Sequence, residues 1–163
     1  MTLVEAVYLT HTMNTRLGRI EREAVIQRAV EVLRRMQEMH QGGTIDDRGE
    51  EFAEQVRQAR ILCPLSELRQ CRLFEARPLA CRLFDLPREE RLKLSADLQQ
   101  GLTRISGEVW FAFTSRYPGD PPLTFFLSEV VSGKFVQGFF HRLMESEGSS
   151  VPGDGDKNQI ERF

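Results

Sequence analysis

The segment 63–87 constrains the fold most strongly, because it interrupts the helical pattern of the rest of the chain. Pro64, Pro78 and Pro87 each lack a backbone N–H donor, and each restricts the residue before it. Between them, the run 71–74 is too short for a helix and is at most a short strand or an extended turn. We therefore expect a compact, irregular segment of about 25 residues, which a helical domain usually holds with a cross-link or uses for function.

Helical spacing of apolar residues predicts helices on both sides of this segment. Thr2 and Glu5 form a capping-box pattern, in which each side chain satisfies a free backbone N–H of the other, at the start of the first helix. The second helix is expected to end at Gly42-Gly43, and Gly101 and Gly107 are expected to weaken or kink the helix that follows Pro87. The predicted helices cover about 3–17, 19–40, 47–62, 88–113, 123–131 and 134–143.

The length of 163 residues favours one domain. Together with the helical pattern it predicts a mostly α fold: a single helical domain over residues 1–144, with a short irregular cysteine-bearing segment between helices. Residues 145–163 are rich in Ser, Gly, Pro and charge and have little apolar surface to bury. We therefore expect this stretch to be a disordered tail.

Charge and hydropathy exclude several classes of partner. The formal net charge is -2 and no basic arm is present, so the chain lacks the electrostatic footprint of a nucleic-acid-binding protein. The longest apolar run, Val109 to Phe113, is far shorter than the ~18 residues that span a bilayer, and we expect no membrane partner and no export signal. An odd number of cysteines without such a signal predicts reduced thiols and a cytoplasmic protein.

All three cysteines, Cys63, Cys71 and Cys81, fall within the irregular segment. Thiolates are soft ligands that select zinc, copper(I) or iron–sulfur clusters. Structural zinc sites usually contain a tight Cys-x2–4-Cys pair, which is absent here, so other ligands would have to come from elsewhere. Nearby arginines are expected to favour the thiolate form; they are Arg60, Arg69, Arg72, Arg77 and Arg82. The alternative is that these are ordinary cysteines beside solvated arginines.

The run from Cys63-Pro64-Leu65 through 71–84, CRLFEARPLACRLF, resembles the second half of the YkgJ-like cysteine-cluster family, with the approximate pattern CPxL…CxIYexRPxxCRxF. The similarity covers about 22 residues closely, with Leu73-Phe74 in place of the usual Ile-Tyr. That family is described as a zinc- or iron-chelating domain. The resemblance therefore implies that Cys63, Cys71 and Cys81 are metal ligands and that the cofactor is zinc, iron or an iron–sulfur cluster.

The first half of the family pattern, a CxxCxxCC-type run, has no counterpart before Cys63. Either that half precedes Met1 in a longer chain, or this member has lost it. The implied site is then incomplete: three cysteines hold zinc with a fourth ligand, or bind three irons of a four-iron cluster. His11, His40 and His141 are not assigned as that ligand, although His141 and Glu145 share a helix face.

Other functions remain open at this point. The chain contains no dinucleotide, P-loop, zincin or hydrolase-elbow motif, so we assign no catalytic residue and leave enzymatic activity undecided. One alternative is a metal-free helical interaction module, in which the aromatic C-terminal helices around 125–140 mediate self-association or bind a protein partner. Another, by analogy alone, is an iron–sulfur-dependent protein-modification enzyme such as the flagellin lysine methylases. The leading prediction is a small cytoplasmic metal-binding protein.

Overall fold

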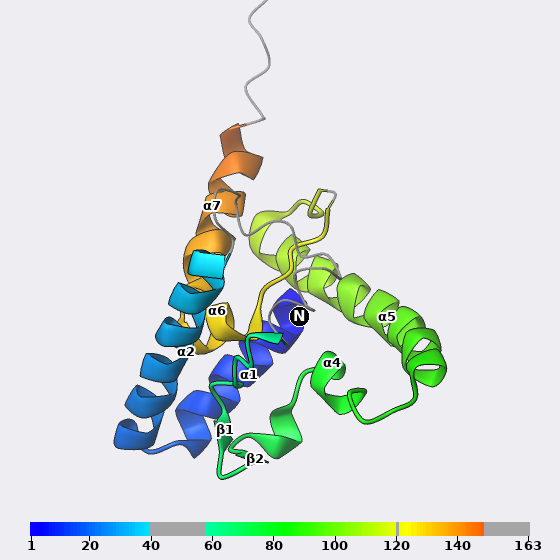
Figure 1. Cartoon of the computed structure of the whole chain (residues 1–163). Coiled ribbons are helices and arrows are strands. Elements are labelled where there is room, and N and C mark those ends of the chain that lie inside the picture. Colours follow the sequence, from blue (N-terminus) through cyan, green and yellow to red (C-terminus); the bar gives the residue numbers. More distant parts are fainter. Residues whose placement is uncertain (40–57, 120, 149–163) are drawn as a thin grey trace, which may run out of the picture.

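The computed structural model describes residues 1–39, 58–119 and 121–148, the last three by their backbone only, and this part of the chain is mostly helical (Figure 1). The predicted mostly α fold class is thereby confirmed. The elements in chain order are α1 (Leu3–Arg16), α2 (Arg19–Met39), β1 (Ser66–Glu67), β2 (Gln70–Cys71), the 3₁₀ turn η1 (Phe74–Ala76), α4 (Leu79–Arg82), α5 (Arg88–Thr114), α6 (Leu127–Ser132) and α7 (Phe135–Gly148).

The core lies where α6 packs between α1 and α2 (Figure 1). The short helix α6 buries Val130 and Val131 almost completely, and its most extensive contacts are with α2. On α1 and α2 the buried positions recur every three or four residues, so each of these helices presents one apolar face to the core. The buried residues of α1 and α2 include Leu3, Ala6, Leu9, Met13, Val25, Ala29, Leu33 and Met36.

The start of the chain is held by hydrogen bonds to distant segments. The predicted capping box is confirmed: Glu5 Oε2 accepts the Thr2 backbone N–H at 2.8 Å and the Thr2 hydroxyl at 3.0 Å. The Phe125 N–H donates to the Met1 carbonyl at 2.9 Å, and the Met1 nitrogen donates to the Phe125 carbonyl at 2.8 Å. The Val4 N–H donates to the hydroxyl of Ser106 on α5, at 3.1 Å. These bonds satisfy polar groups that would otherwise be unpaired at the first turn of α1.

Helix α5 begins directly after Pro87, as predicted, and runs without interruption past Gly101 and Gly107 to Thr114. The two glycines therefore do not interrupt the helix, and the predicted weakening concerns its stability, which stays a prediction. Only the second half of α5 contributes to the core, where Trp110 is 2% exposed and meets the Phe139 ring edge-on at 5.2 Å. The first half is largely exposed and extends away from α1 and α2 (Figure 1).

Three predicted boundaries are wrong. Residues 123–126 are extended rather than helical, because their backbone pairs with the start of the chain through a bridge between Thr2 and Thr124. Helix α7 continues to Gly148, so residues 145–148 belong to a helix and not to the expected tail. The helix predicted at 47–62 does not reach its expected end, because residues 59–62 form a turn and irregular backbone. Residues 47–57 and the rest of the predicted tail lie outside the described residues.

Among the helices that the structure describes, none combines the length and the apolar character that crossing a lipid bilayer requires.

Candidate metal centre

The segment between α2 and α5 is irregular, as predicted, and each cysteine lies in a different local structure. Cys63 opens a turn in which its carbonyl accepts the Ser66 N–H at 2.9 Å, and Cys71 ends the hairpin opposite Ser66. The two residues of the hairpin turn, Leu68 and Arg69, both have positive φ, at 49° and 63°. This turn geometry matches the right-handed twist of paired strands but is strained for residues with a side chain. The hairpin thus brings Cys71 back beside the turn that Cys63 begins.

Cys81 lies on α4, a single helical turn that starts after Pro78. Its first N–H, from Leu79, donates to Glu5 Oε1 at 2.7 Å, so the α1 carboxylate caps this short helix. On the other side of the segment, Arg28 of α2 donates from Nε to the Pro64 carbonyl at 2.9 Å. The two long N-terminal helices therefore position the cysteine-bearing segment at both of its ends.

The three cysteines line one half-open cavity of about 950 Å³. Cys71 and Cys81 are half-buried, Cys63 is more exposed, and all three are free thiols. The other residues that line the cavity include the charged Arg69, Arg77 and Asp85 and the apolar Leu65, Phe74, Pro78, Ala80, Phe84 and Leu127. The residues that the sequence predicts as ligands are thus brought to the same cavity.

Burial dominates the electrostatics of two of these thiols. It raises the pKa of Cys63, and the nearby Cys71 raises it further, against backbone hydrogen bonds from Leu65 and Ser66. Burial likewise raises the pKa of Cys81, and the Cys63 and Cys71 thiolates both add to this effect. Since the charge of Cys71 affects Cys63, and the charges of both affect Cys81, the three thiols are electrostatic neighbours. A cation among them would reverse the shift, because it favours the thiolate form.

Of the five arginines expected to favour the thiolates, Arg77 does so at Cys81, but burial and the neighbouring thiolates outweigh it and the Cys81 pKa is raised. Two others, Arg72 and Arg82, have partners elsewhere. Arg72 pairs with Glu21 on α2 and with Glu67 in the hairpin, and Arg82 donates to the backbone carbonyls of Arg77 and Glu75. Of the five, Arg69 and Arg77 line the cavity. The Arg77 guanidinium lies 3.9 Å from the Phe74 ring centroid, and its buried Nε has no hydrogen-bond partner among the described residues.

The donor set fits a thiophilic metal in part. Three thiols and one carboxylate, Asp85, line the same cavity, which is the right number and chemistry for a tetrahedral ion. In the described part of the chain, however, no three His, Cys, Asp or Glu side chains are close enough to coordinate an ion as they stand. Binding would therefore require the segment to close around the metal.

Asp85 is not among the ligands predicted from the sequence. It lies four residues after Cys81, on the turn that ends α4, and this spacing was the available signal. Glu5 lies near Cys81 as well, but its carboxylate already accepts three hydrogen bonds.

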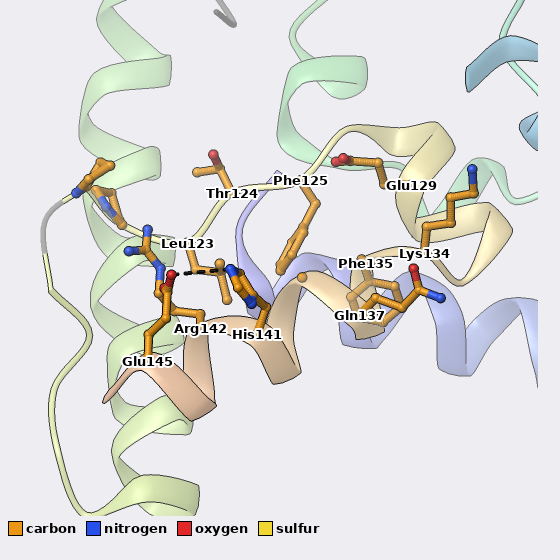
Figure 2. A pocket seen from close by; sticks show the side chains of 13 residues that line it. Leu123, Thr124, Phe125, Glu129, Lys134, Phe135, Gln137, His141, Arg142 and Glu145 are labelled. Carbon is orange, nitrogen blue, oxygen red and sulfur yellow. Dashed lines mark ion pairs between the residues drawn. The ribbon is translucent and has the colours of Figure 1, made fainter. Parts of the chain in front are cut away.

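Neither of the two histidines that the structure describes lines the cysteine cavity. His11 is exposed on α1, and His40 lies outside the described residues. His141 pairs with Glu145 at 3.3 Å on α7, in a different cavity that shares no lining residue with the first (Figure 2). The helix-face pairing of His141 and Glu145 is confirmed, but it cannot supply a fourth ligand at the cysteines.

Comparison with known proteins adds no relative: no family model matches the chain, and neither a curated protein nor a solved structure shows significant similarity to it.

Proposed function

We propose that this chain is a small metal-binding protein in which Cys63, Cys71 and Cys81 hold one zinc ion or one iron centre, in a reducing, cytoplasmic environment. The observation that carries the proposal is the convergence of three thiols, from three separate local structures, on one cavity. The metal would act as a structural cross-link of a segment that has little regular secondary structure.

Charge balance supports the same assignment. Three thiolates around a divalent ion carry one negative charge, and the remaining charged side chains of the cavity, Arg69, Arg77 and Asp85, carry one positive charge. Loading the site therefore leaves the cavity neutral. The buried Arg77 Nε, which lacks a partner among the described residues, would gain an anionic neighbour once the thiols ionise.

The experiment is metal analysis of reduced protein, purified once aerobically with zinc and once anaerobically with iron. We expect about one zinc per chain or a brown, iron-containing protein, and we expect the triple Cys→Ser variant to contain neither metal. Metal at 100 times its dissociation constant adds about 2.7 kcal/mol to the free energy of unfolding, so a chelator should lower the melting temperature of the wild type alone. Equal metal content in wild type and triple variant would contradict the proposal.

Asp85→Asn tests whether the carboxylate completes the site, with Asp97→Asn on the exposed part of α5 as the matched control. Cobalt(II) is the probe, because its visible absorption bands report the number and type of ligands. We expect Asp85→Asn to shift these bands and weaken binding, and Asp97→Asn to leave both unchanged. If the two variants behave alike, the fourth ligand is water or a group outside the cavity.

A metal-free interaction module is the second candidate, because α7 exposes apolar residues at a spacing of four. Val136, Phe140 and Met144 are 42%, 55% and 65% exposed, which forms an apolar stripe on the outer side of the helix. If this is the function, Phe140→Ser should abolish self-association in size-exclusion chromatography. A chelator should leave both the self-association and the melting temperature unchanged. The iron–sulfur enzyme remains an analogy, and colourless, zinc-loaded protein from anaerobic iron-rich cells would count against it.

A further inference from the structure

A second cavity, of about 820 Å³, lies between α7 and the extended segment 121–125 (Figure 2). Its α7 residues, such as Gly138, His141 and Glu145, recur every three or four positions and therefore belong to one face of the helix. Lys134, in the turn before α7, and Arg142, on α7, lie towards opposite ends of the cavity (Figure 2). We call this cavity the α7 groove.

The middle of the α7 groove is apolar. Leu123 and Phe125 point from the extended segment towards α7 (Figure 2), and Phe125 meets the Phe135 ring edge-on at 5.5 Å. Gly138 has no side chain to cover them: a Cβ atom there would lie 3.8 Å from the Phe125 ring. The groove is therefore open at the point where its floor is hydrophobic.

The acidic side chains of the groove have partners within the described part of the protein, and two of its basic side chains do not. Glu145 pairs with His141, and the Glu129 carboxylate accepts the Phe126 N–H at 2.6 Å as part of the cap of α6. The side chains of Lys134 and Arg142, by contrast, have no ion pair or hydrogen bond within the described residues. Both carboxylates thus have partners in the protein, whereas the two permanent cations are available to an anionic ligand.

We propose that the α7 groove binds an extended peptide with the pattern acidic-x-apolar-x-acidic. Lys134 directly precedes α7 and Arg142 lies eight residues further along, which corresponds to about 12 Å at the rise of a helix. In an extended chain, residues four apart are separated by about 13 Å and share one face with the residue between them. Two acidic side chains would then reach the two cations while the central apolar side chain covers Leu123 and Phe125.

The test uses a fluorescent peptide, Ser-Glu-Ser-Leu-Ser-Glu-Ser, and its analogue with both Glu replaced by Gln. We expect the acidic peptide to bind, binding to weaken as salt is raised, and the Gln analogue to bind at least tenfold more weakly. Lys134→Gln and Arg142→Gln should each weaken binding by roughly two- to fivefold, as for exposed ion pairs. Lys93→Gln, at an exposed position of α5, is the control and should have no effect.

Gly138→Leu tests the apolar part without changing any charge. The position is helical and exposed, so the added side chain fills the groove and leaves the fold intact, and Gly101→Leu on α5 is the matched control. We expect Gly138→Leu to abolish binding and Gly101→Leu to preserve it. Equal binding of the two peptides, or unchanged binding by both Lys134→Gln and Arg142→Gln, would overturn the proposal, as would binding of a nucleotide and not the peptide.

The α7 groove shares no residue with the cysteine cavity, so either proposal can fail without the other.

Discussion

The carboxylate of Glu5 joins the first turn of α1 to the first turn of α4, because its Oε1 atom accepts the Leu79 N–H at 2.7 Å while Oε2 caps α1. Cys81 lies two residues beyond Leu79, so the position of the third thiol depends on a residue 76 positions earlier in the chain. A local capping motif therefore also positions the candidate metal centre.

Replacing Glu5 should lower the free energy of unfolding more than replacing an exposed glutamate. Hydrogen bonds to a charged group contribute about 1.5–3 kcal/mol, and Glu5→Ala leaves three donors without their acceptor. We expect a loss of about 2 kcal/mol in urea unfolding, and weaker metal binding. Glu23→Ala, which breaks only an exposed pair with Arg19, is the control and should cost less than about 1 kcal/mol. Equal losses would show that the bond to Leu79 contributes little.

Arg28→Met should loosen the start of the cysteine segment. The substitution removes the hydrogen bond from Nε to the Pro64 carbonyl and keeps an unbranched side chain about as long as the aliphatic stem of arginine. We expect the free energy of unfolding to fall by about 1 kcal/mol and amide exchange around Cys63 to accelerate. Arg35→Met, at an exposed position of the same helix, is the control and should leave exchange in the segment unchanged. Unaltered exchange near Cys63 in Arg28→Met would contradict this role.

The metal-free protein should become less stable at alkaline pH because of Cys63 and Cys81. Burial raises the pKa of both thiols, so the folded state holds their protons more tightly than the unfolded chain does. Their contribution is fully present below the unfolded pKa of about 8.5 and is lost as the pH rises through the folded values. Chelator-treated wild type should therefore lose more stability between about pH 8 and pH 10 than the Cys63→Ser, Cys81→Ser double variant. Parallel pH profiles would refute this linkage.

Two glycine substitutions should have opposite effects on stability. Gly133 ends α6 with a φ of 81°, where an L side chain is strained although no atom lies within 4 Å of a Cβ. Gly133→Ala should therefore cost about 1 kcal/mol. Gly101 is an interior position of α5 with equally open surroundings, so Gly101→Ala should add about 0.5–1 kcal/mol through helix propensity. Urea midpoints measure both, and a stabilising Gly133→Ala would exclude the left-handed conformation.

The predictions from sequence succeeded where the deciding interactions are local. The capping box of Thr2 and Glu5, the start of α5 after Pro87 and the irregular segment between the helices all depend on neighbouring residues, and all three are confirmed. The helix predicted from residue 123 failed because the backbone of Phe125 pairs with Met1, a partner at the other end of the chain. A pattern of apolar residues carries no information about such a distant partner.

For the cysteines, too, some properties follow from the sequence and others from the tertiary structure. Their number, order and interruption by prolines are properties of the sequence, and so is the choice of soft, thiolate-based chemistry that they favour. Three further properties depend on the packing: whether the three thiols share a cavity, whether burial or arginine charge controls the pKa values of Cys63 and Cys81, and which carboxylate accompanies the thiols. Local conformation follows from neighbouring residues, whereas burial and charge environment sum contributions from residues anywhere in the chain, and only folding brings those residues together.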